Sequence, residues 1–324
     1  MRPRRYLEAN QVYFASARVR EGLPFIPDPL MKTFVEGVLA RAQELYPVTI
    51  CHDIFMGNHF HLLFVCKDPT AVINFFCYVK TALAIGINKL TGRRGPVWEN
   101  RTDMPIVLTL EKAIELIVYI YTNPASSSIT SSISSYPGIS SWQAFKEDKT
   151  SKQCTWIKTS QLKRIYRCID ELRARTNLLR EISDSKKAKQ VTLKLSPNEW
   201  MKCFGINNEK QIKEINDLIF QKINERELQL NKERISLPAR AALLKTQSLY
   251  KKFKPKKFNN RVYCLSHNSN IRKSFIRKYK DLVYKCKEVY NLWKQGCLDI
   301  TMPLGMLSPP KPLLAVAIYQ NGYD

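Results

Sequence analysis

Residues 56–66, Met-Gly-Asn-His-Phe-His-Leu-Leu-Phe-Val-Cys, carry the pattern from which the fold can be worked out. Side chains two positions apart in a strand point to the same face, so His59 and His61 should stand side by side, about 6.5 Å apart. Phe60, Leu62 and Phe64 then point the other way, into a core. The pair Gly57-Asn58 is typical of a tight turn, which makes this strand the second arm of a hairpin.

Two imidazoles on one strand face can hold a metal ion from a rigid support. A strand whose histidines are only hydrogen-bonded or exposed explains the spacing equally well. The chain has four histidines, and two of them share this face, which favours a site.

The flanking sequence alternates between strand and helix patterns. Strands are predicted where apolar and polar residues alternate, and helices where apolar residues recur every three or four positions. These elements are strand 11–20, helix 30–45, strand 48–56, strand 59–66, helix 69–83, an irregular strand 97–108, and helix 110–123, which we expect Pro124 to stop. The order predicts an α+β fold, a ferredoxin-like antiparallel sheet with helices, over residues 1–145.

The positive charge lies mainly in the second half. Residues 1–150 hold 16 Lys and Arg and 13 Asp and Glu, a net of +3, whereas residues 151–324 hold 36 and 15, a net of +21. Such a surplus favours a polyanionic partner, because each neutralised phosphate releases a counterion. Residues 146–324 are therefore predicted to form a basic, mainly α-helical extension.

Within the extension, helices are expected over 160–182, 209–230 and 271–293, with another starting at the capping-box sequence 196–199. Residues 183–195 suggest a flexible joint. The serine-rich residues 125–141, which precede the extension, suggest a surface loop or linker.

Other features limit the class of protein. No apolar run approaches the roughly 20 residues that span a bilayer, and no apolar signal region follows the N-terminus, so we expect no membrane partner. Nine cysteines without a CxxC pair are typical of reduced thiols in a cytoplasmic protein and argue against a zinc ribbon. A Walker-type glycine loop is absent from the sequence.

The helix 110–123 offers partners for the histidine pair. Tyr119 and Asn123 are four residues apart and share one helix face, whereas Tyr121 points roughly the opposite way. Docked against the histidines, an amide oxygen could complete a metal site and a tyrosine hydroxyl could lie beside it. From spacing alone, an amphipathic helix with core tyrosines and a C-terminal asparagine is the better interpretation.

Four segments together resemble the HUH-type single-tyrosine transposases, in particular the REP-associated tyrosine transposases. MGNHFHLLF resembles that family's histidine signature, with Gly57 in place of the usual proline, which predicts a looser turn. VYIYTNP, residues 118–124, is similar to its catalytic helix. Residues 97–101 resemble its W-x-x-R segment, and residues 136–142 its usual ending.

The resemblance covers about residues 1–145 and implies cleavage and rejoining of single-stranded, hairpin-flanked DNA. It implies that His59, His61 and Asn123 hold a divalent ion and that Tyr119 is the nucleophile. Imidazole and amide ligands suit Mg²⁺ or Mn²⁺ with positions left for phosphate oxygens. A covalent 5′-phosphotyrosine stores the bond energy, so no ATP is needed.

Further DNA contacts are expected from basic residues. Candidates are Arg93 and Arg94 in a glycine-flanked loop, Arg101 in the W-x-x-R segment, and the lysines of the basic aromatic stretch 250–258, namely Lys251, Lys252, Lys254, Lys256 and Lys257. A solvated turn explains the two loop arginines as well.

Single-stranded or hairpin DNA is thus the expected partner of a nucleoid-associated monomer or homodimer. Two alternatives remain: a replication initiator or relaxase, which usually needs further histidines or a second tyrosine, and a DNA-binding regulatory protein that keeps the fold without activity.

Overall fold

The computed structural model describes residues 6–25, 28–165, 171–185, 188–233 and 262–303 of the 324-residue chain. The chain divides into two units, residues 9–267 and residues 1–8 with 268–324. In the second unit the predicted basic helix is present as α9 (Ser269–Lys294), capped by the Asn268 side chain. The ring of Tyr6 packs edge-on against Phe275 and Tyr279 of that helix.

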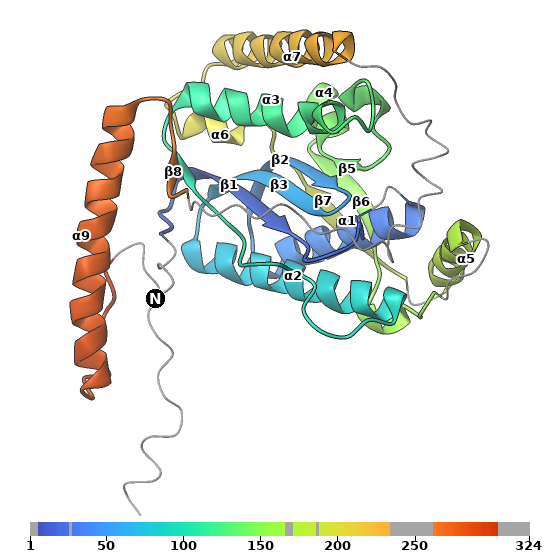
Figure 1. Cartoon of the computed structure of the whole chain (residues 1–324), viewed down its shortest axis with the longest axis horizontal. Coiled ribbons are helices and arrows are strands. Elements are labelled where there is room, and N and C mark those ends of the chain that lie inside the picture. Colours follow the sequence, from blue (N-terminus) through green and yellow to red (C-terminus); the bar gives the residue numbers. More distant parts are fainter. Residues whose placement is uncertain (1–5, 26–27, 166–170, 186–187, 234–261, 304–324) are drawn as a thin grey trace, which may run out of the picture. The chain divides into compact units, whose positions relative to one another are not determined.

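The first unit is built on a six-stranded sheet in the order β5-β2-β3-β1-β4-β8 (Figure 1). Its long strands are β1 (Gln11–Arg18), β2 (Thr49–Met56) and β3 (His59–Cys66), and its short ones are β4 (Ile106–Val107), β5 (Ile139–Ser140) and β8 (Cys264–Leu265). All neighbouring pairs are antiparallel except β4 with β8. Because β3 lies between β1 and β2, and β1 between β3 and β4, each strand–helix–strand unit is split by a strand of the other, as in ferredoxin-like folds. The predicted α+β fold class is confirmed.

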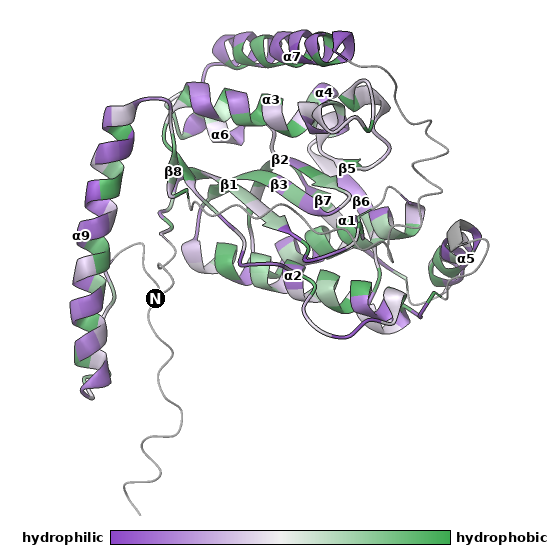
Figure 2. Cartoon of the chain, in the orientation of Figure 1, coloured by the Kyte–Doolittle hydropathy of each residue, from purple (hydrophilic) through white to green (hydrophobic). Residues whose placement is uncertain are grey.

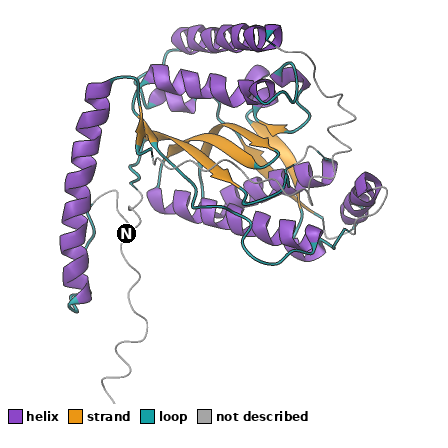
Figure 3. Ribbon diagram, in the orientation of Figure 1, coloured by secondary structure: helices purple, strands orange, loops and turns teal. Residues whose placement is uncertain are grey.

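Helices cover both faces of this sheet (Figure 3). On one face lie α1 (Pro29–Leu45) and α2 (Pro69–Thr91), each with proline in its first turn and an aspartate cap, Asp28 or Asp68. On the other face lies α3 (Leu110–Ser126), whose outer side packs on α7 (Glu209–Lys232). The alternation of β3 decides which side chains meet which layer: Phe60 and Phe64 pack on Phe76 of α2, whereas Leu63 and Val65 join the core with α3.

The hairpin turn between β2 and β3 is held by the segment that follows β1. The carbonyl oxygen of Gly57 accepts a hydrogen bond from Phe25 N, and that of Asn58 accepts one from Val19 N. These bonds fix where β3, and therefore His59, begins.

The region predicted as an irregular strand, 97–108, pairs with β1 in three places. Trp98 forms a bridge with Val19, Asp103 forms one with Ser16, and Ile106 pairs with Tyr13. Between the first two bridges, residues 99–102 face only residues 17–18 of β1, so this stretch must bulge outward. The bulge lies next to the histidine end of β3, since Arg18 pairs with His59.

Between residues 146 and 267, the first unit contains strands as well as the predicted helices. β6 (Ser151–Trp156) and β7 (Lys189–Lys194) form an antiparallel pair that packs on α1. The stretch 183–195, expected as a flexible joint, therefore contains a strand, because Val191 and Leu193 point inward from it. Whether residues 1–145 act as a separate domain stays a prediction.

Three other expectations need correction. Helix 160–182 is shorter: η2 (Thr159–Gln161) is a single turn, and α5 comprises Glu171–Ser183. The capping-box sequence is followed only by the short α6 (Glu199–Lys202), with Asn198 as its cap residue. The serine-rich stretch is not a free linker, because it contains η1 (Ile133–Ser135) and β5 and ends at α4 (Trp142–Lys146).

Hydropathy separates the core helices from the outer ones (Figure 2). The exposed positions of α7 and α9 are mostly hydrophilic, whereas α2 is apolar and long enough to pass a length-and-composition test for a membrane span, with a mean hydropathy of 1.6. A core helix of a globular protein passes the same test. Val72, Phe75 and Val79 of α2 are buried inside the unit.

Candidate active site

The histidine pair stands on the central strand of the sheet, on the face that α3 covers. His59 pairs with Arg18 of β1 and His61 with Ser16, so both histidines lie near the end of β1. Their rings are 4.9 Å apart between centroids. The predicted arrangement of two imidazoles on one strand face is present.

Tyr119 is the residue of α3 that reaches this pair. Its hydroxyl oxygen lies 3.3 Å from Nε2 of His61, and the two ring centroids are 5.1 Å apart. Phe14 stacks on the His61 ring at 5.3 Å and contacts the edge of Tyr119, which fixes both rings. Tyr119 is nevertheless 46% exposed, so a reactant from solvent can reach it.

Asn123 lies one helical turn beyond Tyr119 and is 5% exposed. Its Oδ1 accepts a hydrogen bond from Ser127 Oγ at 3.3 Å, and its side chain lies close enough to the Tyr119 hydroxyl to act on the pKa of that group. α3 continues past Pro124 to Ser126, contrary to the expectation that proline would end it. Proline in the last turn removes one backbone donor without preventing the helical path, so Asn123 and Ser127 stay on one face.

Burial keeps both histidines neutral. It lowers the pKa of His59 to about 4 and that of His61 to about 3, and the positive charge of Arg18 contributes to both shifts. Burial also raises the pKa of the Tyr119 hydroxyl, although the Asn123 side chain and the charge of Arg18 act in the opposite direction. At neutral pH the site thus holds two imidazole lone pairs beside a protonated phenol.

The residues fit a small divalent cation. His59 Nδ1 hydrogen-bonds to Asn58 Oδ1 at 2.7 Å, which orients the ring and leaves Nε2 for a ligand. His61 Nδ1 is buried and has no hydrogen-bond partner within the described part of the chain. Among those residues no three His, Cys, Asp or Glu side chains gather in a metal-holding cluster. The amide of Asn123 is the further oxygen ligand that α3 offers on the Tyr119 face.

A cavity of about 250 Å³ adjoins the histidines, and both positively and negatively charged residues line it. It lies between β1 and the 99–102 bulge, and its lining comprises Ser16, Ala17, Arg18, His59, His61, Glu99, Asn100, Arg101 and Asp103. The predicted DNA contact Arg101 is therefore brought to the histidines.

Trp98 positions this bulge. Its indole N–H donates to the carbonyl oxygen of Lys80 in α2, and its ring stacks on Phe25. Lys80 in turn donates to the carbonyl oxygen of Asn100 at 2.7 Å. The tryptophan of the W-x-x-R segment thus anchors the chain, and its arginine lies at the cavity.

The other predicted DNA contacts are not brought to the site. Arg93 pairs with Glu21 at 2.6 Å, and Arg94 is exposed in the loop after α2; neither lines the cavity. Lys251, Lys252, Lys254, Lys256 and Lys257 lie outside the described residues.

Tyr121 occupies a second, closed tyrosine–histidine cluster. Its hydroxyl hydrogen-bonds to His52 Nδ1 at 2.7 Å and to Ser141 Oγ at 3.0 Å, and its ring stacks on Phe145. It is 0% exposed, so a substrate has no access to it. The structure therefore places Tyr119, not Tyr121, beside the strand histidines.

Sequence reasoning did not single out Arg18, Asn58 or Ser127. Arg18 could have been found from strand register, because a β1–β3 pairing that starts at the hairpin turn sets it opposite His59. Ser127 follows Asn123 by four residues, a spacing that predicts a contact once the helix is known to continue past Pro124.

No protein-family model matches the sequence, and no curated protein matches it. Among solved structures, the chain is similar to a REP-associated tyrosine transposase bound to a REP hairpin, at 14% identity and a TM-score of 0.37. The similarity covers 45% of this chain and 86% of that one. This likeness concerns the fold and by itself assigns no activity.

Proposed function

We propose that this protein is a transposase-like enzyme that cleaves and rejoins single-stranded, hairpin-flanked DNA through Tyr119. The observation that carries the proposal is a solvent-accessible tyrosine hydroxyl 3.3 Å from Nε2 of a buried, neutral histidine, beside a cavity with two arginines. A structural tyrosine would be expected to be sealed, as Tyr121 is.

In the cleavage step, the Tyr119 oxygen forms a bond to the scissile phosphorus and the bond from phosphorus to the 3′-oxygen breaks. The phenol gives its proton to solvent, and the 3′-oxygen leaves as a hydroxyl after taking a proton from solvent. The product is a 5′-phosphotyrosine. Attack by a 3′-hydroxyl reverses the step, so strands are rejoined without an external energy source.

We also propose that His59, His61 and Asn123 hold Mg²⁺ or Mn²⁺. Bound there, the ion would polarise the scissile phosphate and stabilise the charge that develops on it. The amide of Asn123 can supply its oxygen by a half-turn about its last side-chain bond, because Ser127 Oγ can accept a hydrogen bond from the amide nitrogen as well as donate to the oxygen.

The charge distribution supports DNA as the substrate. The chain carries a net +24, and the site itself presents Arg18 and Arg101, whose side chains suit phosphate oxygens. We propose that the protein acts in the cytoplasm at the nucleoid, as a monomer or homodimer.

A covalent-adduct assay tests this function. The protein is incubated with a labelled DNA hairpin carrying single-stranded flanks and Mn²⁺, and denaturing electrophoresis separates free DNA from DNA bonded to protein. Wild type and Tyr121→Phe should form the adduct and Tyr119→Phe should not. Hairpin binding without any wild-type adduct would favour a regulatory DNA-binding protein, and an adduct with Tyr119→Phe would point to another nucleophile.

A further inference from the structure

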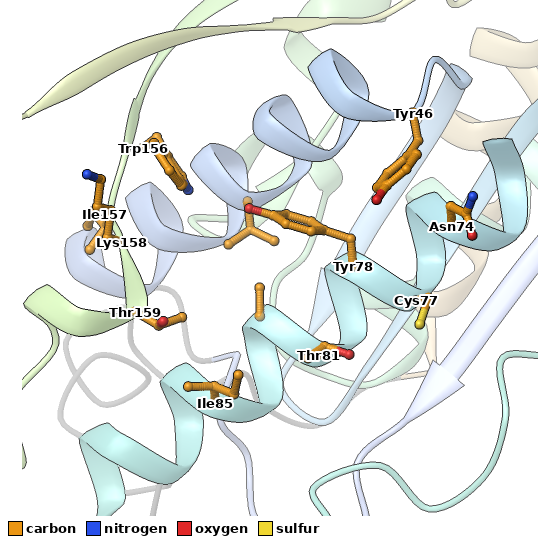
Figure 4. A pocket seen from close by; sticks show the side chains of 12 residues that line it. Tyr46, Asn74, Cys77, Tyr78, Thr81, Ile85, Trp156, Ile157, Lys158 and Thr159 are labelled. Atoms are coloured by element: carbon orange, nitrogen blue, oxygen red, sulfur yellow. The ribbon is translucent and has the colours of Figure 1, made fainter. Parts of the chain in front are cut away.

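A second cavity lies on the opposite layer of the same unit, where α1, α2 and the end of β6 meet (Figure 4). It encloses about 520 Å³, within the range of pockets that hold small organic ligands. None of its lining residues belongs to the candidate active site.

Gly37 allows this cavity to form. A Cβ atom on Gly37 would lie 2.3 Å from the carbonyl oxygen of Thr155, so only glycine lets β6 pass this close to α1. The next residue, Trp156, thereby reaches the cavity wall. Its indole nitrogen and the hydroxyl of Tyr78 point toward each other (Figure 4).

Three cationic groups surround Trp156, which forms one wall of the cavity, and one of them, Lys158, lines the cavity itself. The guanidinium of Arg41 lies 5.0 Å from the Trp156 ring centroid, and the ammonium groups of Lys158 and Lys189 lie 5.6 and 5.8 Å from it. Glu44 forms ion pairs with Arg41 and Lys189, at 2.7 and 3.6 Å. The three cations and this carboxylate together carry a net charge of +2. Arg41 Nε is buried and has no hydrogen-bond partner within the described residues, so a donor remains unused.

The rest of the lining is aromatic and apolar with a polar rim. The rings of Tyr46 and Tyr78 lie 6.5 Å apart at 58°, and Ile85, which is 43% exposed, lines the cavity further along α2, near Thr159 (Figure 4). Asn74 and Thr81 supply an amide and a hydroxyl at the edge. The aromatic rings can stack on a flat, unsaturated group of a ligand, and Asn74 and Thr81 can hydrogen-bond to polar atoms at the edge of that group.

A flat heterocycle joined to an anion matches the aromatic lining and the cationic groups at once. A nucleotide has this form: a base that stacks on aromatic rings and a phosphate that binds Arg and Lys. A simple anion would leave the aromatic lining unused, and an apolar ligand would leave the cations uncompensated.

We propose that this cavity binds an unpaired nucleotide of single-stranded DNA, with its base against Tyr46 and Tyr78 and its phosphate toward Lys158, on the side where Arg41 and Lys189 add positive charge around Trp156. The choice of DNA as the source of the nucleotide rests on the proposed function. The cavity would then hold a DNA strand at a second point, away from Tyr119.

Cys77 makes the proposal directly measurable, because it lines the cavity and its thiol is exposed. Alkylation of Cys77 by iodoacetamide is followed by mass spectrometry, with the exposed Cys297, which does not line the cavity, as the internal reference. A short oligothymidylate should slow alkylation of Cys77 at least about fivefold relative to Cys297, as expected for a site that is mostly occupied. Thymidine monophosphate at the same nucleotide concentration should protect it much less.

Two variants test whether the oligonucleotide binds in this cavity. Tyr46→Ala and Lys158→Ala should each weaken oligothymidylate binding about tenfold, measured by fluorescence anisotropy. Lys210→Ala, which removes the same charge from exposed α7, is the matched control and should change binding less than twofold. Unchanged melting temperatures for Tyr46→Ala and Lys158→Ala would separate lost contacts from lost folding.

The proposal is overturned if the oligonucleotide leaves Cys77 as reactive as before, if the monophosphate protects and the oligonucleotide does not, or if Lys210→Ala weakens binding as much as Lys158→Ala. The assay uses Tyr119→Phe protein as well as wild type. Protection of Cys77 without any covalent adduct in wild type would contradict the proposed function alone, whereas an adduct without protection would contradict the nucleotide site alone.

Discussion

Two tyrosine–histidine pairs join α3 to the sheet, and they differ in almost every property except composition. The Tyr121–His52 pair is sealed: its hydroxyl and ring nitrogen are 2.7 Å apart, Ser141 also hydrogen-bonds to the hydroxyl, and aromatic rings surround it. The Tyr119–His61 pair is looser, at 3.3 Å, and its tyrosine is open to solvent.

The difference shows how neighbouring residues of one helix acquire different roles. Tyr119 and Tyr121 are two positions apart, so α3 turns one toward the open end of the sheet and the other into the core. A buried hydrogen bond between two enclosed side chains contributes to the stability of the fold, whereas an accessible hydroxyl beside a neutral imidazole can react. Four substitution or pH experiments test this contrast.

The largest effect is expected from removing the two hydroxyls separately. Tyr119→Phe should lower adduct formation at least about a thousandfold, because no other nucleophile replaces the phenol. Tyr121→Phe should keep adduct formation and lower the free energy of unfolding by about 1–3 kcal/mol, because it leaves the buried Nδ1 of His52 without its hydrogen-bond partner. Single-turnover gels and urea titrations measure the two effects. The contrast fails if both variants lose the same property.

Substitution of the two histidines should show the same contrast, with a loss of activity at His61 and a loss of stability at His52. His61→Ala should reduce Mn²⁺-supported cleavage about a hundredfold or more, and EDTA should do the same to wild type. His52→Ala should lower the unfolding free energy without a comparable loss of cleavage by the folded fraction. Cleavage that resists EDTA would contradict the proposed metal.

Stability should fall in mild acid. Burial lowers the pKa of His59 to about 4 and those of His52 and His61 to about 3, against about 6.5 in an unfolded chain. Below about pH 6.5 the unfolded chain therefore binds protons that the folded chain does not, and unfolding becomes easier. At pH 5 each histidine should contribute a loss of about 2 kcal/mol relative to pH 7.

Urea titrations with EDTA present at both pH values measure this dependence. His61→Gln should reduce the difference between the two pH values by about 2 kcal/mol, since the titrating group is gone. An unchanged difference would mean that His61 is not held neutral in the folded state.

The smallest effect concerns the arginines. Arg101→Gln should reduce the slope of log affinity against log salt for single-stranded DNA by about 0.7, the value for one lost phosphate contact. Arg93→Gln serves as the matched control, because Arg93 pairs with Glu21 and lies outside the cavity. Equal changes in both variants would show that charge alone, rather than position at the cavity, decides the effect.

Much of the fold could be predicted because its signals are local. Alternation in residues 59–66 sets the two histidines on one face and the phenylalanines on the other, and the aspartate and proline residues mark the starts of α1 and α2. The same periodicity, applied to the helix 110–123, separated Tyr119 from Tyr121. These predictions depend only on how a strand or helix directs its side chains.

What could not be predicted depends on contacts between distant segments. The serine-rich stretch looks like a linker in composition, yet Tyr136 donates to the carbonyl oxygen of Phe55, and Ile133 N donates to Glu227 Oε1 at 2.6 Å. Likewise, β7 is too polar for its alternation to stand out, and only its pairing with β6 against α1 makes it a strand. Arg18 gains its place in the site from strand register.

The most direct test is to identify the amino acid that becomes bonded to DNA. Wild-type protein is trapped as an adduct with a hairpin substrate in Mn²⁺, digested with protease and nuclease, and the modified peptide is fragmented by mass spectrometry. A 5′-phosphonucleotide on Tyr119 is the expected result. A modification on Tyr121 or on any other residue, or none in protein that binds the hairpin, would contradict it.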